Sequence, residues 1–236
     1  MAEESIENYL SCSISKDNWK NIGFKKRAGV LIPLFTVHSK NSYGIGDLGD
    51  LKLIIDWAKS TGNSIIQLLP MNEAGALFCP YDALSSFALE PVYLCLKDFP
   101  SLKDKIYEPS VNDYLYIDYA LKKEKLQLLW DVYLAEDLSQ ALDFEEFQQK
   151  NFYWLTDFAL FKLFKDNHQG KPWYEWEERF KNRNRQALSD FQQDNIEEIT
   201  FQIWLQWVLF KQFKAAGDYA AKNNIFLRAV IRFLFT

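Results

Sequence analysis

The sequence AGVLIPLFTVHSKNSYGIGDLGDLKLIIDWAKSTGNSIIQLL, residues 28–69, decides the fold of this chain. It begins with a near-continuous apolar run at residues 28–35, which predicts a strand buried on both faces, as strands of a parallel sheet are. A glycine-punctuated loop and apolar residues at helical spacing follow, and Gly62 stands where a helix stops. Residues 64–69 predict a second buried strand. This order of strand, loop, helix and strand is the repeating unit of a parallel α/β fold.

The loops that leave the two predicted strands span residues 36–49 and 70–88. In a (β/α)8 barrel, the loops at the carboxyl ends of the strands form the active-site face. Asp47 and Asp50 stand just ahead of the predicted helix, where a carboxylate caps the first turn, and we expect this structural role for both. The string GIGDLG matches neither phosphate-binding pattern, and Asp47 would repel a phosphate. The sequence therefore predicts no nucleotide site.

Four strings, in order, resemble the 4-alpha-glucanotransferases (amylomaltases, disproportionating enzymes) of glycoside hydrolase family 77. SKNSYGIGDLG at residues 39–49 is similar to the family's first active-site loop. QLLP and PYDALSSFA, within residues 67–88, are similar to its second strand and loop. WLTDFALF at 154–161 resembles the family's helical insertion, and residues 206–220 resemble its helix before the third strand. The resemblance runs over roughly residues 29–227 and implies retaining transfer of α-1,4-glucan segments between maltooligosaccharides, with no cofactor and no metal.

The resemblance also implies two substrate-contact residues in this sequence. Tyr81 matches the family tyrosine that contacts the glucose ring next to the scissile bond, and Tyr43 of the first loop is the second candidate. The family has Ser before Pro-Tyr, where this sequence has Cys79. Retaining transfer needs two carboxyl groups about 5–5.5 Å apart. The family carries them on later strands and no matching string is present here, so we expect no catalytic residue in this chain and assign none to Glu73.

The predicted fold is therefore α/β, an incomplete (β/α)8 TIM barrel with its first strands only and a large helical insertion. We expect a lead-in at residues 1–27, the first βα units at 28–96, the helical insertion at 97–196, and a helix with a third barrel strand at 197–236. From Arg228 onward the sequence departs from the family's Gly-Asp-x-Pro string. This departure leads us to expect a truncated or frameshifted reading frame that is inactive by itself.

Composition limits the compartment and the partners. The 236 residues carry a net charge of −5, which argues against a nucleic-acid or anionic-membrane partner. No apolar run reaches the ~18 residues needed to span a bilayer. The cysteines are an odd number without CxxC spacing, which fits reduced thiols in a cytoplasm. We expect a cytoplasmic protein whose partner is an α-1,4-glucan, while its oligomeric state and glucan length preference stay open.

Two other interpretations compete with a transferase. The first is a non-catalytic glucan-binding protein derived from the same family, which kept only the aromatic loops; the high aromatic content, 17%, suits it but also suits core filling. The second is a barrel glycosidase of the amylase type. It is disfavoured because the four ordered strings fit family 77 and no amylase catalytic string is present.

Overall fold

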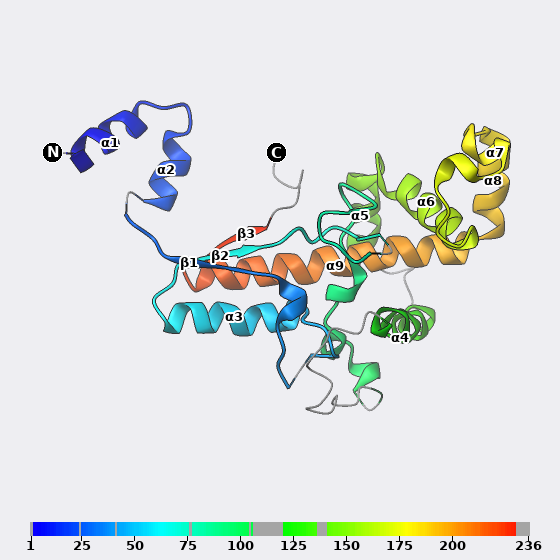
Figure 1. Cartoon of the computed structure of the whole chain (residues 1–236), viewed down its shortest axis with the longest axis horizontal. Helices are drawn as coiled ribbons and strands as arrows, with labels where there is room; N and C mark the ends of the chain where they lie inside the picture. Colours follow the sequence, from blue (N-terminus) through cyan, green and yellow to red (C-terminus); the bar gives the residue numbers. More distant parts are fainter. Residues whose placement is uncertain are drawn as a thin grey trace.

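The fold is known from a computed structural model (Figure 1). It describes residues 2–23, 25–40, 42–75, 77–103, 105, 120–135 and 141–229. The helices are α1 Ala2–Ser11, α2 Lys16–Ile22, α3 Leu48–Ser60, α4 Leu121–Ala135, α5 Leu142–Asn151, α6 Leu155–Asn167, α7 Glu178–Lys181, α8 Arg185–Asp194 and α9 Ile196–Lys222. The strands are β1 Gly29–Ile32, β2 Ile65–Leu68 and β3 Phe226–Ala229.

The strands form one three-stranded parallel sheet in the order β1-β2-β3. The register places Val30, Ile66 and Leu227 side by side across the sheet. Helix α3 connects β1 to β2, and the whole helical region, ending in α9, lies between β2 and β3. A parallel sheet of βα units is thus confirmed, together with mainly helical structure over much of the chain between its second and third strands.

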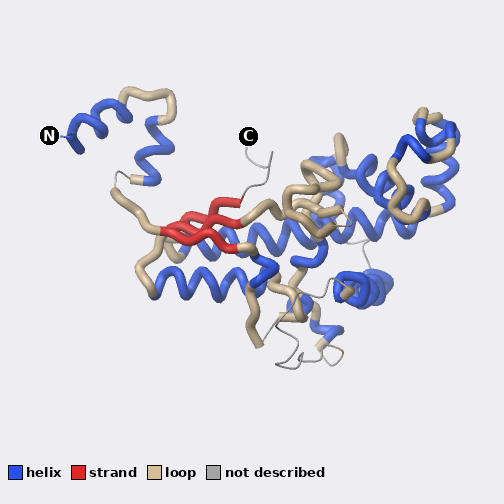
Figure 2. The backbone as a smooth tube through the Cα atoms, viewed as in Figure 1, coloured by secondary structure: helices blue, strands red, loops and turns tan. Residues whose placement is uncertain are grey.

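Of the residues that the structure describes, helices cover one face of the sheet and leave the other open. Figures 1 and 2 show α3 and α9 running along the same side of the strands, and contacts join α3 to β2 and α9 to β3. Ile66 of β2 lies on the covered face and is fully buried. Leu31 of β1 follows Val30, the partner of Ile66, so it points to the opposite face, where it is 55% exposed. The prediction of a strand buried on both faces is therefore wrong for β1, because the described residues place helices against one face.

The apolar run at residues 28–35 also contains more than a strand. Strand β1 stops at Ile32, and Pro33 leads into the 3-10 turn η1 Leu34–Thr36. Proline has no N–H to continue the ladder. Leu34 is nevertheless buried, at 2% exposure, so the second half of the run fills the core at the start of the first loop rather than extending the sheet.

Helix α9 is the central support of the described structure. It packs against both α3 and α6, so it links the sheet to the helical region. Its residues Trp204 and Leu205 are fully buried. Helices α1 and α2 project beyond the end of the sheet (Figure 1). In the described parts of the chain, no helix combines the length and apolarity required to cross a membrane.

The predicted departure from the family pattern falls mostly on residues 230–236, which lie outside the described residues. Arg228 itself belongs to β3 and pairs with Gln67 of β2.

Candidate functional site

The two loops that follow β1 and β2 lie at the same end of the sheet, because the strands are parallel. The first loop continues from η1 to the start of α3, and the second runs from Pro70 to Ala88. Segments of 3-10 helix then follow, beginning with η2 Pro91–Tyr93. Buried charged groups contact each loop on its core side. Ion pairs and hydrogen bonds therefore fix the shape of this end of the sheet, together with packing.

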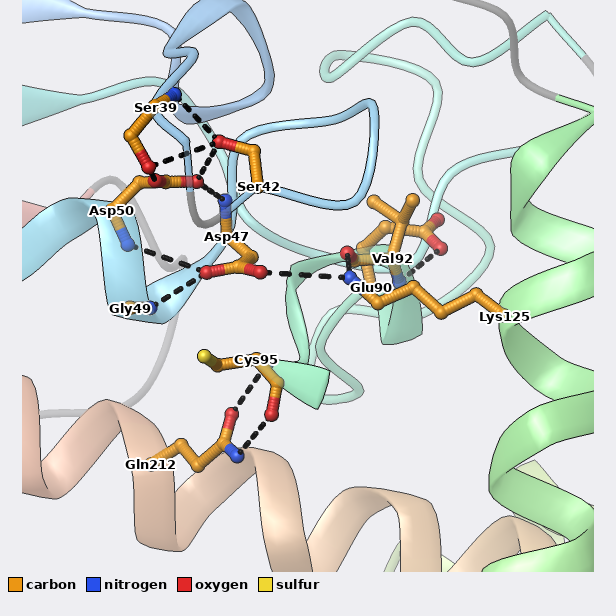
Figure 3. A network of polar contacts seen from close by, with 10 residues as sticks. All are labelled: Ser39, Ser42, Asp47, Gly49, Asp50, Glu90, Val92, Cys95, Lys125 and Gln212. Atoms are coloured by element: carbon orange, nitrogen blue, oxygen red, sulfur yellow. Dashed lines mark hydrogen bonds and ion pairs between the residues drawn. The ribbon is translucent and has the colours of Figure 1, made fainter. Parts of the chain in front are cut away.

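The first loop closes on the amino end of α3 through two carboxylates (Figure 3). Asp47 Oδ1 accepts hydrogen bonds from the backbone N–H groups of Gly49 at 2.8 Å and Asp50 at 3.3 Å. Asp50 Oδ2 accepts in return from Asp47 N at 3.0 Å and from Ser42 Oγ at 2.8 Å. This is a reciprocal capping box. The predicted structural role of both aspartates is confirmed.

Asp47 also faces a buried lysine. Lys125 of α4 is 2% exposed, its Nζ lies 3.9 Å from Asp47 Oδ2, and it donates a 2.6 Å hydrogen bond to Val92 O in η2 (Figure 3). Burial raises the pKa of Asp47 to about 6, against the lowering effect of Lys125. Burial likewise lowers the pKa of Lys125. The pair joins the first loop to α4 and η2, and sequence reasoning missed it; the available signal was a lysine at a core-facing position of a helix.

The second loop folds back on itself as a short hairpin. Isolated antiparallel bridges join Asn72 to Leu89 and Ala74 to Ala83. At the far end of this hairpin Tyr81 is 74% exposed. The loop is thus fixed at its base while its tip presents an aromatic ring to solvent.

Beneath that hairpin lies a group of buried charges. Glu73 has no exposed surface, and its Oε1 lies 3.5 Å from Lys122 Nζ and 3.8 Å from Lys162 Nζ. Glu90 pairs with the same Lys122 at 2.6 Å and accepts a 2.9 Å hydrogen bond from Ala74 N. Burial raises the pKa of Glu73 to about 7, with Lys122 as the largest opposing influence. A carboxylate without exposed surface anchors the hairpin to α4 and α6 and does not face a substrate.

The structure separates the two tyrosines predicted to contact substrate. Tyr81 is exposed, whereas Tyr43 is only 7% exposed and belongs to the core cluster. In the described residues, the loops therefore offer the Tyr81 ring to a ligand and enclose the Tyr43 ring. A cavity of about 20 Å³ lined by Pro80 and Tyr93 lies under the second loop. It holds about one water and no sugar ring.

A broader hollow of about 1140 Å³ lies along β3 and the second half of α9. Its lining includes Phe213 of α9, Phe226 and Ala229 of β3, and Ser64 just before β2. None of its lining residues belongs to the two loops that carry Tyr43 and Tyr81, so this hollow is not part of the predicted site.

Among the described residues, no cluster of three or more His, Cys, Asp or Glu side chains has a metal-binding arrangement. Cys12, Cys79 and Cys95 are unpaired thiols.

Comparison with known proteins identifies the family of this chain. The model of glycoside hydrolase family 77, described as 4-alpha-glucanotransferase, matches residues 32–231. This chain belongs to glycoside hydrolase family 77. The 4-alpha-glucanotransferase of Chlamydia caviae is 31% identical over 235 residues, which are 95% of this chain and 44% of that protein. That of Aquifex aeolicus is 32% identical over 208 residues, 84% of this chain and 41% of that protein.

Solved structures of two amylomaltases share the fold of this chain. The amylomaltase from Streptococcus agalactiae in complex with acarbose superposes with a TM-score of 0.75 at 24% identity, covering 86% of this chain and 43% of that chain. The amylomaltase from Corynebacterium glutamicum gives a TM-score of 0.68 at 22% identity, covering 92% of this chain and 32% of that chain. The family 77 chain described here spans less than half the length of these relatives.

Proposed function

We propose that this chain forms one wall of the glucan-binding cleft of a 4-alpha-glucanotransferase, an enzyme that transfers α-1,4-glucan segments between maltooligosaccharides. The observation that carries the proposal is the exposed Tyr81 ring at the tip of a hairpin whose base is held by buried Glu73 and Glu90. An aromatic ring on a rigid support can stack on the apolar C–H face of a glucose unit with little loss of conformational entropy.

The fold proposal is that β1, β2 and β3 are the first three strands of a (β/α)8 barrel, with α4 to α8 inserted between the second and third. The three parallel strands in the order β1-β2-β3 and the TM-score of 0.75 to an amylomaltase support it. The open face that carries Leu31 and Gln67 then corresponds to the barrel interior. In this arrangement the first and second loops belong to the face on which barrel enzymes bind substrate.

The chemistry of such an enzyme requires two kinds of residue: those that bind the glucan and the carboxylates that cleave its bond. Retention requires a nucleophilic carboxylate and an acid/base carboxyl group about 5–5.5 Å apart. The 236 residues contain no string that matches the family's carboxylates, and Glu73 and Asp47 are committed to buried ion pairs. We therefore propose that this chain supplies substrate contacts through Tyr81, while Tyr43 shapes the first loop. Cleavage of the glycosidic bond then depends on residues outside this sequence.

The curated relatives are named as transferases, which favours this function over a non-catalytic glucan-binding protein. A cytoplasmic location is part of the same proposal. It is supported by the three unpaired cysteines, since disulfides are rare in reducing compartments.

The test has two parts. The purified 236-residue chain, incubated with maltotriose, is expected to release no glucose; protein-dependent release would contradict the assignment of the carboxylates to other residues.

Calorimetric titration with maltoheptaose is expected to give weak binding that Tyr81→Ala reduces roughly 3–10-fold, the worth of one aromatic contact. Tyr9→Ala, which truncates an equally exposed ring on α1 (78% exposed), is the matched control. Equal binding by wild type and Tyr81→Ala would remove Tyr81 from the site.

A further inference from the structure

A second hollow lies in the helical region, away from both loops. It has a volume of about 200 Å³ and is formed by α6, α7, α8 and the 3-10 turn η7 Trp173–Glu175. Aromatic side chains make up much of its lining: Phe161, Phe164, Trp173, Trp176 and Phe180. Trp176 and Phe164 are buried at 9% and 3% exposure, whereas Trp173 is 56% exposed. The hollow thus has a buried aromatic interior and one solvent-exposed ring, Trp173, at its edge.

The interior is rigid because its rings pack on one another. Phe164 lies 5.5 Å from Trp176 and 4.5 Å from Phe180, measured between ring centroids. Trp176 Nε1 donates a hydrogen bond of 3.2 Å to Lys171 O, which fixes the indole. A cavity held open in this way loses little entropy when a ligand enters.

The rim of the hollow is charged. Asp157 and Arg183 both line it, and Arg183 Nη2 donates to the two Asp157 oxygens at 2.9 and 3.0 Å. Their side chains are 67% exposed for Arg183 and 59% for Asp157, and an exposed ion pair is worth only ~0–1 kcal/mol. Arg183 has φ 52, in the left-handed region that favours glycine, at the residue after the C-cap of α7. Both charged side chains thus lie at the rim of the hollow.

This combination of groups matches the chemistry of a pyranose. A glucose ring has an apolar C–H face, which an indole covers, and a rim of hydroxyls, each of which donates to a carboxylate and accepts from a guanidinium. The volume lies below the ~300–1,000 Å³ of pockets for drug-sized ligands, so it suits one sugar unit. Asp157 and Arg183 pair with each other, and their remaining lone pairs and N–H groups at the rim can bind the hydroxyls of a sugar but not an apolar ligand.

We propose that this hollow is a second carbohydrate site that holds one glucose unit of an α-1,4-glucan against Trp173, with Asp157 and Arg183 bound to its hydroxyls. The inference rests on the proposed function for the choice of glucan.

The second site and the Tyr81 hairpin use opposite faces of α6. Asp157, Leu160 and Phe164 follow one another at helical spacing and line the hollow. Lys162, about 200° around the helix from Leu160 at 100° per residue, reaches instead to Glu73 beneath the hairpin. A glucan bound at Trp173 is therefore held outside the cleft, where it raises the local concentration of chain ends near Tyr81.

Nuclear magnetic resonance of the whole 236-residue chain tests the proposal directly. The eight tryptophans give eight indole N–H signals, and Trp173→Phe assigns the one of interest. Titration with maltose is expected to shift the indole signals of Trp173 and Trp176. Asp157→Ala and Trp173→Ala are each expected to weaken the maltose response at Trp176 at least tenfold, with the other indole signals unmoved to show that the fold is intact.

Two controls separate the sites. Tyr174→Ala truncates a neighbouring ring that is 59% exposed and does not line the hollow, and it is expected to leave the response unchanged. Tyr81→Ala is also expected to leave the maltose response unchanged.

If Tyr81→Ala abolishes maltose binding and Trp173→Ala does not, the second site is refuted while the proposed function stands. If Trp173→Ala alone abolishes binding, the second site is established and the role of Tyr81 fails. Binding of 1-anilinonaphthalene-8-sulfonate at Trp173 without any response to maltose would also overturn the carbohydrate site.

Discussion

Gln206 of α9 pairs with both backbone polar groups of Leu89: its Oε1 accepts from Leu89 N at 2.8 Å, and its Nε2 donates to Leu89 O at 2.9 Å. Gln206 is fully buried, and the two residues are 117 positions apart. Gln212, further along the same helix, does the same for Cys95, with distances of 2.8 and 3.1 Å. At Leu89 and Cys95, the segment that leaves the second loop therefore obtains its backbone hydrogen bonds from side chains of α9. Its residues Ala88 and Glu90 pair instead with the backbone of Glu73 and Met71.

Replacing Gln206 with leucine is expected to destabilise the chain by about 2–4 kcal/mol. The change keeps the volume but leaves the Leu89 N–H and C=O buried without partners, and each such group costs ~1–3 kcal/mol. Urea denaturation followed by tryptophan fluorescence measures the free energy of unfolding. The same substitution at exposed Gln193 of α8 is the control and is expected to change it by less than ~0.5 kcal/mol. Equal stability of the two variants would show that the backbone at Leu89 finds other partners.

The regular elements follow from local pattern, and the sequence predicts them well. The helix expected to follow Asp47 and Asp50 and to stop at Gly62 is α3, which begins slightly earlier, at Leu48, so that Asp50 lies in its first turn. Both aspartates cap it as expected, and Gly62 has φ 77, the left-handed conformation of a helix terminator. The helix expected ahead of the third strand, within residues 197–236, is α9. Periodicity and caps are properties of a few neighbouring residues, so they are readable without tertiary information.

The buried charged groups of the candidate site pair with residues that are distant in the sequence, so their partners could not be identified in this way. Lys125 sits on a helix of ordinary composition, and its burial depends on Asp47, which lies 78 positions earlier in the numbering. Glu73 looks like an isolated loop carboxylate, yet Lys122 and Lys162 reach it from two helices. The exposure of Tyr81 and the burial of Tyr43 likewise follow from how the loops fold, since both rings occur in similar polar strings.

The buried Glu73 is expected to make stability depend on pH. Its pKa in the folded chain, about 7, lies above its ordinary value of 4.5 because of burial. The native chain therefore binds more protons than the unfolded chain between pH 4.5 and 7, and the free energy of unfolding falls as pH rises through that window. Asp47, with a pKa raised to about 6, acts in the same direction.

Glu73→Gln is expected to flatten this fall, because a neutral amide has no proton to lose and Lys122 keeps its 2.6 Å ion pair with Glu90. Urea denaturation at a series of pH values from 4.5 to 8 measures it. Glu124→Gln, an exposed position on the same helix as Lys122, is the control and should keep the wild-type profile. A profile for Glu73→Gln that parallels the wild type would mean that Glu73 stays ionised across the window.

The thiols are expected to differ strongly in reactivity. Cys12 is exposed, whereas Cys95 is buried and its burial raises the thiol pKa to about 12. Because the thiolate is the nucleophile, Cys95 should react with Ellman's reagent at pH 8 only when the chain opens. The Cys12→Ser/Cys79→Ser double variant isolates this thiol, and we expect its modification to be at least ~100-fold slower in buffer than in 8 M urea. Comparable rates would show that the Cys95–Gln212 contact is open in the native chain.

Two glycine substitutions should have opposite effects on stability. A Cβ at Gly46 would lie 2.1 Å from Leu34 O and 2.5 Å from Val37 O, both backbone atoms of the first loop. Gly46→Ala must therefore displace the loop against the core, and we expect the free energy of unfolding to fall by at least ~2–3 kcal/mol.

A Cβ at Gly217 within α9 meets nothing within 4 Å. Gly217→Ala is expected to stabilise the chain by roughly 0.5–1 kcal/mol, because alanine is the better helix former. Both values come from urea denaturation, with Gly217→Ala showing that an added methyl group alone is harmless. A Gly46→Ala variant as stable as the wild type would mean that the first loop can move away from Leu34 without cost, and the rigid support inferred for this end of the sheet would then be wrong.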